Sequence, residues 1–194
     1  MTRIISGAAG GVRLDVPSSG TRPTSDRVRE SLFGALEASD AIHGARVVDL
    51  YAGSGALGLE AASRGAASVD LVERAKPAAA IARRNADGVR RAMGAGAPPV
   101  RVHAAAVGTW LRRASGPFDL VLLDPPYDLP DAELAENLAA LARVLARGAL
   151  VIVERASRSG APDWAAAGLE PLRDRAYGDT ALWWGQPATE SQSR

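Results

Sequence analysis

The sequence predicts an α/β fold in which helices cover both faces of one mostly parallel, seven-stranded β-sheet, and three observations support this prediction. Between residues 45 and 185, short apolar segments alternate with amphipathic helical segments, which is the pattern of β-α-β units. A glycine-rich turn joins the first of these strands to the helix that follows it. The last two strands are separated only by Gly178-Asp179, which predicts an antiparallel hairpin at one edge of the sheet.

The strands expected in this region are short, apolar and bounded by polar residues, glycine or proline. They are Arg46–Leu50, Ser68–Val72, Val100–His103, Phe118–Leu123, Ala149–Val153, Leu172–Tyr177 and Thr180–Trp184. The helices expected between them are Ala56–Arg64, Pro77–Met93, Val107–Arg113 and Asp131–Ala146. Right-handed crossovers between the parallel strands then determine how the helices are distributed over the sheet.

Residues 1–44 are expected to form an N-terminal extension to the domain at residues 45–185. Arg3–Ser6 and Val12–Val16 are predicted as two short strands, with glycines in the turn between them. A helix is expected at Asp26–Ala38, because apolar residues recur on one face and Asp26 lies in the first turn, where the helix dipole favours an acid. The polar residues 186–194 are expected to be a disordered tail.

The composition fits a globular protein with one core. The 194 residues are 47% hydrophobic and 23% charged. The sequence has no cysteine, so disulfides, thiolate zinc sites and a cysteine nucleophile are excluded, and the isolated His43 and His103 predict no metal site. No apolar run is long enough to span a membrane and the N-terminus lacks the features of a signal peptide, so a cytoplasmic protein is expected, most simply a monomer.

The net charge is only +1, but positive charge is unevenly distributed. Between residues 74 and 113 the sequence has nine arginines and lysines and a single acid, Asp87. This distribution is compatible with an anionic partner on one face of the protein, and equally with a general bias toward arginine.

A glycine-rich turn and two acids indicate a site for a cofactor. Gly53 and Gly55 allow the backbone to approach a ligand where a Cβ would clash, and the helix that follows offers unpaired N–H groups. Asp49 ends the strand before this turn, where a carboxylate would face the cationic amino acid part of S-adenosylmethionine. Glu73 ends the next strand and can accept hydrogen bonds from both hydroxyls of a ribose. The residues expected to bind the cofactor from these two turns are Asp49, Tyr51, Gly53, Ser54, Gly55, Glu73 and Arg74.

The same glycine spacing supports an alternative from another class. Gly53-x-Gly55-x-x-Gly58 matches the fingerprint of nicotinamide dinucleotide enzymes, and Glu73 lies where their ribose-binding acid is expected. A dehydrogenase or a non-catalytic nucleotide-binding module would fit this pattern. Two features count against it: Asp49 would repel a pyrophosphate, and the loop described next has no use in hydride transfer.

The stretch Asp124-Pro125-Pro126-Tyr127 follows directly after a buried, apolar strand, and its four residues are the predicted catalytic residues. Two prolines fix φ and remove N–H donors, so the loop is stiff. The Asp124 carboxylate and the Pro125 carbonyl can therefore accept both N–H groups of an exocyclic amine, which orients its lone pair toward a methyl donor and stabilises the positive charge that develops on nitrogen. Tyr127 offers a face on which the base can stack.

Four segments together resemble the bacterial 16S rRNA guanine-N2 methyltransferase family, and they extend over almost the whole chain. They are Arg3–Gly7, Thr21–Phe33, Asp49–Glu60 and Asp124–Tyr127. Many methyltransferases share the glycine and proline loops, whereas Thr21–Phe33 is the specific segment. The resemblance implies a class I, Rossmann-like methyltransferase domain with S-adenosylmethionine as methyl donor. It also implies that the acceptor is the exocyclic N2 amine of a guanine in 16S rRNA or in the small ribosomal subunit.

The resemblance further implies that the N-terminal extension helps to hold the RNA. The contacts expected there are Arg3, Arg22, Thr24, Arg27 and Arg29. One position departs from the family pattern, because Ala106 stands where an acid or amide usually binds the adenine amino group. The adenine is therefore expected to be held by backbone groups and apolar contacts at Ala105 and Ala106, with Asp124 also bordering the cofactor.

Two other classes of methyltransferase share the Asp-Pro-Pro-Tyr chemistry and are kept as alternatives. One methylates the N6 amine of adenine in DNA, and the other methylates a glutamine side chain in a protein. Against the first, the short N-terminal extension leaves little room for a domain that reads a DNA sequence.

Overall fold

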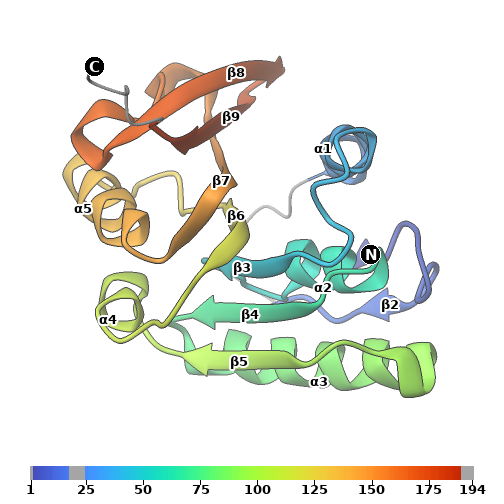
Figure 1. Cartoon of the computed structure of the whole chain (residues 1–194). Coiled ribbons are helices and arrows are strands. Elements are labelled where there is room, and N and C mark those ends of the chain that lie inside the picture. Colours follow the sequence, from blue (N-terminus) through green and yellow to red (C-terminus); the bar gives the residue numbers. More distant parts are fainter. Residues whose placement is uncertain (1, 18–24, 189–194) are drawn as a thin grey trace.

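In the computed structural model, seven strands form one sheet in the order β5-β4-β3-β6-β7-β9-β8 (Figure 1). The structure describes residues 2–17 and 25–188. Neighbouring strands from β5 to β7 are parallel, whereas β9 is antiparallel to β7 and β8 is antiparallel to β9. These pairings confirm the predicted α/β fold with a mostly parallel sheet and an antiparallel C-terminal hairpin.

The elements lie close to their predicted positions. The strands of the sheet are β3 (Arg46–Leu50), β4 (Ser68–Glu73), β5 (Val100–Ala104), β6 (Phe118–Leu123), β7 (Leu145–Ala156), β8 (Leu169–Tyr177) and β9 (Thr180–Pro187). The helices are α1 (Asp26–Ala38), α2 (Ala56–Ser63), α3 (Lys76–Met93), α4 (Val107–Leu111) and α5 (Asp131–Ala142). Two further strands, β1 (Thr2–Arg3) and β2 (Arg13–Leu14), form a separate antiparallel pair. The predicted disordered tail at residues 186–194 was wrong for Gln186 and Pro187, which pair with β8 as the end of the last strand, and residues 189–194 lie outside the described part of the chain.

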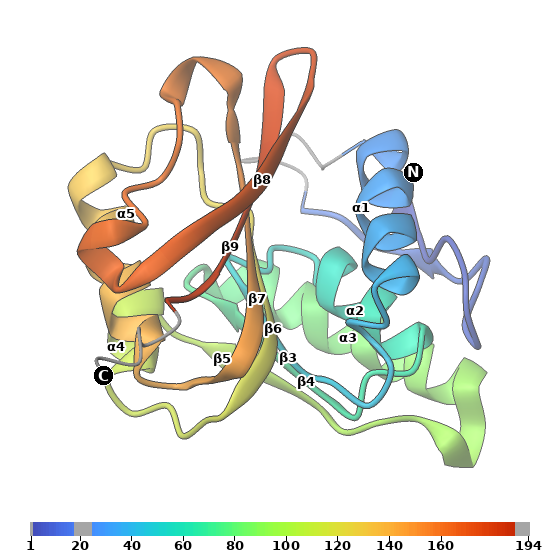
Figure 2. The same ribbon diagram turned by 45° about the horizontal axis from the view of Figure 1, so that its top comes forward.

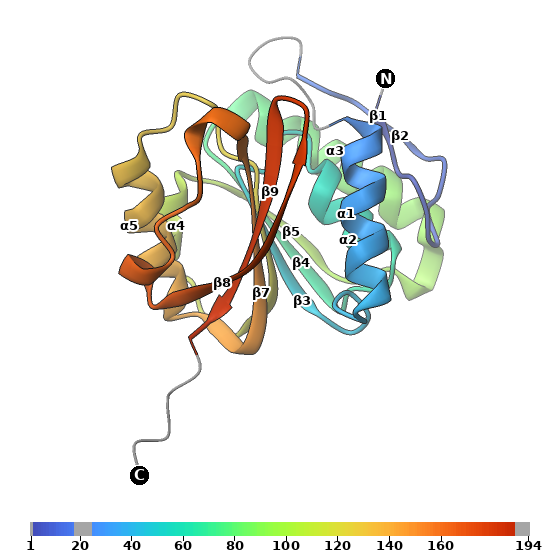
Figure 3. The same cartoon turned by 90° about the horizontal axis from the view of Figure 1, so that it is seen from above.

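Helices cover both faces of the sheet, and each face has its own hydrophobic core (Figures 2 and 3). One core joins α1, α2 and α3 to the sheet and includes Phe33, Leu59 and Leu71. The other joins α4 and α5 to the opposite face and includes Leu111 and Leu138. The central strands are therefore buried on both sides, which holds their carboxyl ends rigidly at the edge where open α/β sheets bind ligands.

The strand β7 begins earlier than the sequence predicts. The helix expected over Asp131–Ala146 ends at Ala142, and the strand starts at Leu145. Leu145 pairs with Phe118 of β6, and a register shift follows before the regular pairing resumes. The helical periodicity could not show this, because the extra pairing is made with another strand and not within the segment itself.

The N-terminal extension packs on α2, and Glu60 and Ser63 make hydrogen bonds between them. The strands β1 and β2 confirm the predicted hairpin, although both are shorter than expected. Glu60 is fully buried, and its carboxylate accepts hydrogen bonds from the backbone N–H groups of Ile5 (2.7 Å) and Ser6 (3.0 Å). It also pairs with Arg64 at 2.7 Å. One carboxylate thus replaces water for two backbone donors and one cation.

We expect Glu60→Ala to lower the free energy of unfolding by about 3–5 kcal/mol, because it leaves two backbone donors without their acceptor and removes the buried one of the two carboxylates that pair with Arg64. Glu37→Ala is the matched control, since Glu37 also pairs with Arg64 (2.7 Å) but its side chain is 50% exposed. The control should cost less than about 1 kcal/mol. Urea unfolding measures both changes, and equal losses would contradict the role given to Glu60.

None of the described helices is long and apolar enough to cross a membrane. Within residues 2–17 and 25–188, no group of three or more histidine, aspartate or glutamate side chains is arranged to hold a metal ion.

Candidate active site

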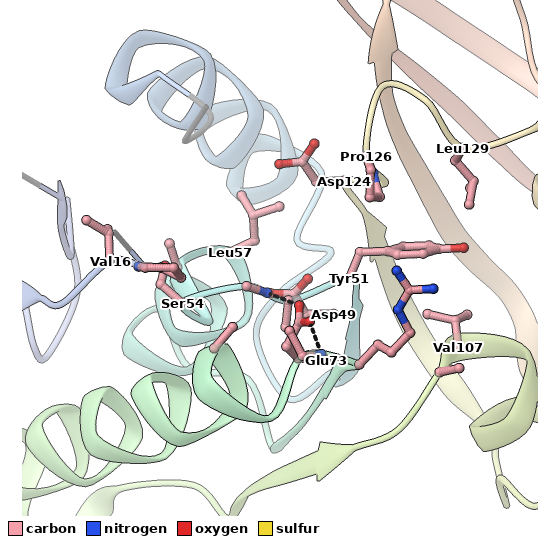
Figure 4. Close-up of a pocket in the computed structure, with 18 of the residues that line it drawn as sticks. Val16, Asp49, Tyr51, Ser54, Leu57, Glu73, Val107, Asp124, Pro126 and Leu129 are labelled. Carbon is pink, nitrogen blue, oxygen red and sulfur yellow. Dashed lines mark hydrogen bonds between the residues drawn. The ribbon is translucent and has the colours of Figure 1, made fainter. Parts of the chain in front are cut away.

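A cavity of about 530 Å³ opens at the carboxyl ends of β3, β4 and β6 (Figure 4). Its walls come from the turn after β3, the end of β4, the start of α4 and the loop after β6. Thr2, Val16 and Pro17 of the N-terminal extension border one side. The glycine turn and the proline loop, which are far apart in the sequence, therefore face one common space.

The turn after β3 presents mainly backbone to the cavity. Tyr51 and Gly53 have φ angles of 66° and 54°, in the left-handed region, and Gly53 lines the cavity together with Ser54. Gly55 lies behind the lining and has a φ of 82°, and a Cβ there would come within 2.9 Å of Leu71 Cδ1. Gly55 is predicted to contact the cofactor, but in the structure it sets the backbone conformation of the turn and packs closely on β4, while Gly53 faces the cavity.

Asp49 is 1% exposed and yet lines the cavity. Its Oδ2 accepts a hydrogen bond from the Gly58 N–H at 2.9 Å, whereas its buried Oδ1 has no partner among the described residues. Burial raises the pKa of Asp49 to about 8; the hydrogen bond from Gly58 opposes this, and the negative charges of Asp124 and Glu73 add to it. A buried carboxyl group with an unused acceptor is suited to receive a cation or an N–H donor from a ligand.

Glu73 is held in place by backbone donors at the end of β4. Its Oε2 accepts from the Gly53 N–H at 2.9 Å, and its Oε1 accepts from the Ala75 N–H at 2.6 Å (Figure 4). Each oxygen keeps a further acceptor site, so the fixed carboxylate can still accept from hydroxyl groups of a ligand. The exposed Arg74 also lines the cavity, beside Glu73.

The loop after β6 contributes Asp124 and Pro126, which lie across the cavity from Asp49 and Glu73 (Figure 4). Pro125 is buried and does not line this cavity. Tyr127 is 50% exposed and lies outside the lining, with its hydroxyl 3.4 Å from Thr180 Oγ1 at the start of β9. Of the four predicted catalytic residues, the structure thus brings Asp124 and Pro126 to the cavity and leaves the ring of Tyr127 at the surface.

The end of the cavity near α4 is formed by Ala106, Val107 and Tyr51. Ala105 does not line it, and its N–H donates to the Glu73 carbonyl at 3.1 Å. The Tyr51 hydroxyl accepts a hydrogen bond from Asn137 at 2.8 Å, and burial raises the pKa of Tyr51 to about 12. Asn137 carries no sequence signal for this role, because it lies 86 residues from its partner.

The residues predicted to contact RNA differ in their positions. Arg22 and Thr24 lie outside the described residues. Arg3 and Arg27 are exposed, as such a contact requires. Arg29 does not fit this expectation, because it is only 1% exposed and lines the cavity.

Arg29 is held inside the protein by two contacts. Its Nη2 lies 2.6 Å from the Asp26 carboxylate and donates to the Arg3 carbonyl at 3.0 Å. The helix periodicity explains the burial, since Arg29 shares a face of α1 with Leu32, Phe33 and Leu36. A phosphate at the protein surface would not reach this guanidinium.

Comparisons with known proteins agree with this geometry. The model of the family described as "Conserved hypothetical protein 95" matches residues 2–186. Over 161 residues, the chain is 38% identical to ribosomal RNA small subunit methyltransferase D of Escherichia coli K12. The aligned residues cover 82% of this chain and 77% of that protein.

Two solved structures are also similar over nearly their whole length. One is the Escherichia coli methyltransferase yhhF, with a TM-score of 0.78, 34% identity and coverage of 96% of this chain and 97% of that one. The other is a hypothetical protein from Thermus thermophilus, with a TM-score of 0.79, 32% identity and coverage of 95% and 98%. The resemblance therefore includes the N-terminal extension as well as the sheet.

Proposed function

Because the chain belongs to the family described as "Conserved hypothetical protein 95" and is a methyltransferase, we propose that it transfers a methyl group from S-adenosylmethionine to the exocyclic N2 amine of a guanine in 16S rRNA of the small ribosomal subunit. The observation that carries this proposal is that Asp124 of the proline loop borders the same cavity as Asp49 and Glu73. The likeness to a ribosomal RNA small subunit methyltransferase supports RNA as the acceptor.

The cavity fits S-adenosylmethionine in charge and polarity. Asp49 Oδ1 is a buried acceptor that lacks a partner among the described residues, as the ammonium group of the cofactor requires. Glu73 is fixed by two backbone donors and can accept from the ribose hydroxyls. Ala106 and Val107 offer an apolar surface for the adenine. When bound, S-adenosylmethionine would supply an electrophilic methyl carbon next to a positively charged sulfur.

The residues of the proline loop would position the amine that is methylated. The Asp124 carboxylate accepts one N–H of the amine. The Pro125 carbonyl is proposed to accept the other, which requires the loop to shift when the base binds, because Pro125 is buried behind the cavity lining in this structure. Because the amine lone pair is delocalised into the base, fixing both N–H groups turns it toward the methyl donor. The carboxylate also stabilises the positive charge that appears on nitrogen as the bond forms. The exposed ring of Tyr127 is proposed to stack on the base or on its neighbour.

Among the described residues, Arg3 and Arg27 are proposed to contact RNA phosphates from the surface. Arg29 is proposed to act inside the cavity instead, where its charge balances part of the negative charge of the acidic residues that line it. The alternative of a nicotinamide dinucleotide enzyme is disfavoured by Asp49, because a pyrophosphate would be placed next to a buried acid.

The test is to incubate the protein with radiolabelled S-adenosylmethionine and small ribosomal subunits that lack this modification, and then to map the methylated nucleoside. Label in N2-methylguanosine of 16S rRNA is expected. Parallel incubations contain DNA or protein in place of the subunits. Label only in N6-methyladenine of DNA, or only in glutamine of a protein, would support one of the two related methyltransferase classes and overturn the proposed acceptor. Calorimetry with S-adenosylmethionine and with a nicotinamide dinucleotide separates the cofactor classes.

A further inference from the structure

The outer strand of the C-terminal hairpin carries two exposed arginines without ion-pair partners. Arg173 and Arg175 lie on β8, which is the edge strand of the sheet. No carboxylate of the described residues lies within ion-pairing distance of either guanidinium, although the chain has almost as many acids as bases. Unpaired positive charge of this kind is available to an anionic partner.

Aromatic rings hold both guanidinium groups in place. The Arg173 Cζ lies 4.5 Å from the centroid of the Trp184 ring, and the Arg175 Cζ lies 5.3 Å from that of Tyr177. An arginine stacked in this way has already lost conformational freedom before a partner binds, and its N–H groups stay directed outward. The β8 arginine strip, defined as Arg173, Arg175 and Tyr177, is thus an ordered set of donors and not a pair of free side chains.

The β8 arginine strip lies on the face of the sheet that α1 covers. Arg173 and Arg175 pair with Trp184 and Leu182 of β9, whose side chains belong to the core beneath α1. Tyr177 OH lies 2.5 Å from Ser31 Oγ of α1. Figure 3 shows α1 next to the β8–β9 hairpin, which forms one edge of the sheet. Asp174 points to the opposite face, because side chains alternate along a strand.

The strip starts next to the proline loop, two of whose residues, Asp124 and Pro126, line the cavity. Thr180, which pairs with Tyr177, lies 3.4 Å from the hydroxyl of Tyr127 in the proline loop. From Tyr177 to Arg175 and on to Arg173, the side chains follow one another at intervals of about 7 Å. On the facing helix, Arg27 is exposed and makes no ion pair with a described residue, and an added Cβ at Gly34 would meet nothing within 4 Å.

We propose that the β8 arginine strip binds the phosphates of the RNA strand next to the methylated nucleotide, so that the strand leaves the cavity across the outer surface where α1 and the C-terminal hairpin meet. This inference rests on the proposed function, and it places an RNA contact at the opposite end of the chain from the predicted one. Ordered arginines near the exposed ring of Tyr127 fit single-stranded RNA, which offers phosphates and open base faces together.

The test compares the double variant R173Q/R175Q with R90Q/R91Q. The second pair removes the same charge from the last turn of α3, at the other edge of the sheet. Binding of a fluorescein-labelled single-stranded RNA and of unmethylated small ribosomal subunits is measured over a series of salt concentrations. R173Q/R175Q should bind the single-stranded RNA about tenfold or more weakly near 0.1 M salt, and the slope of log K against log salt should shrink by about 1.4. S-adenosylmethionine affinity should not change.

A second pair of variants tests the same surface without touching the arginines. Gly34→Glu places a carboxylate on α1 opposite the β8 arginine strip, and Gly34→Gln is its neutral control. Both replacements favour the helix, so both should fold. Only Gly34→Glu should weaken RNA binding, by several-fold.

The proposal is overturned if the salt slope of R173Q/R175Q equals that of the wild type, or if R90Q/R91Q loses as much affinity. It is also overturned if R173Q/R175Q changes the oligomeric state, since the strip would then be a contact between copies of this chain. A wild-type protein that binds S-adenosylmethionine but no RNA would instead refute the proposed RNA substrate, and this inference with it.

Discussion

Asp124→Asn is expected to lower kcat for methyl transfer by about 100- to 1,000-fold, the usual loss when a preorganised group that stabilises charge in the transition state is removed. Asp124 lines the cavity opposite Asp49 and Glu73, at the end of a loop that two prolines make rigid. Asparagine keeps the size of the side chain but removes the negative charge that stabilises positive charge on the amine. The measurement is a single-turnover assay with labelled S-adenosylmethionine and unmethylated small subunits.

Cofactor binding separates this role from a structural one. Calorimetry should give nearly the wild-type affinity of Asp124→Asn for S-adenosylmethionine, because Asp49 and Glu73 are unchanged. Asp128→Asn is the control, since Asp128 is an exposed residue of the same loop that also lines the cavity; its kcat should stay close to that of the wild type. Near-normal turnover by Asp124→Asn would rule out the proposed role of this carboxylate.

The affinity for S-adenosylmethionine should rise about tenfold between pH 6 and pH 7, and binding at pH 7 should release a proton. Burial raises the pKa of Asp49 to about 8, so most of this group is protonated in the free protein at these pH values. An ammonium group bound next to Asp49 favours the ionised carboxylate. The protonated carboxyl group of the free protein must therefore lose its proton when the ligand binds. The rise should end near pH 8, where the α-amino group of the ligand itself loses its charge.

Asp49→Asn is the matching variant for this prediction. It should abolish the increase in affinity between pH 6 and pH 7 and lower the affinity at pH 8 by roughly 30-fold or more, as expected for loss of a buried charge partner. Calorimetry in two buffers of different ionisation enthalpy measures the released proton directly. An unchanged pH dependence in Asp49→Asn would show that another group titrates.

The raised pKa of Asp49 also predicts how the free energy of unfolding of the ligand-free protein depends on pH. The pKa of Asp49 is raised from 3.8 to about 8 by folding, so the unfolded chain ionises first as the pH increases. The contribution of Asp49 to the free energy of unfolding is therefore greatest below about pH 4 and is lost as the pH rises toward 8. Asp49→Asn should flatten this dependence.

Local features of the sequence were sufficient for much of the site. The proline loop, the glycine turn and the acids that end β3 and β4 follow from restrictions that act within a few residues, and the parallel sheet brings those strand ends to one edge. The sequence also places Arg29 on the apolar face of α1, because of its spacing from Leu32, Phe33 and Leu36. It does not show that this face borders the cavity. The prediction that Arg29 contacts RNA rested on its positive charge.

Other parts of the site depend on contacts between distant segments. The hydrogen bond from Asn137 to Tyr51, the outward position of Tyr127 beside Thr180 and the placement of Arg173 and Arg175 beside α1 each require a particular packing of elements. The register of β8 against β9 contains a shift between Pro171 and Arg173, which the alternation of apolar residues does not reveal.

The sequence by itself determined the order of strands and helices, the stiff proline loop and the placing of acids at strand ends, because backbone restrictions and side-chain periodicity act locally. Only the tertiary structure decided which charges are buried and which face solvent, since burial and pKa depend on what packs around a group. The surrounding residues make Asp49 a weaker acid than a solvent-exposed aspartate and place Arg29 in the cavity wall. They leave Arg173 and Arg175 exposed to a partner.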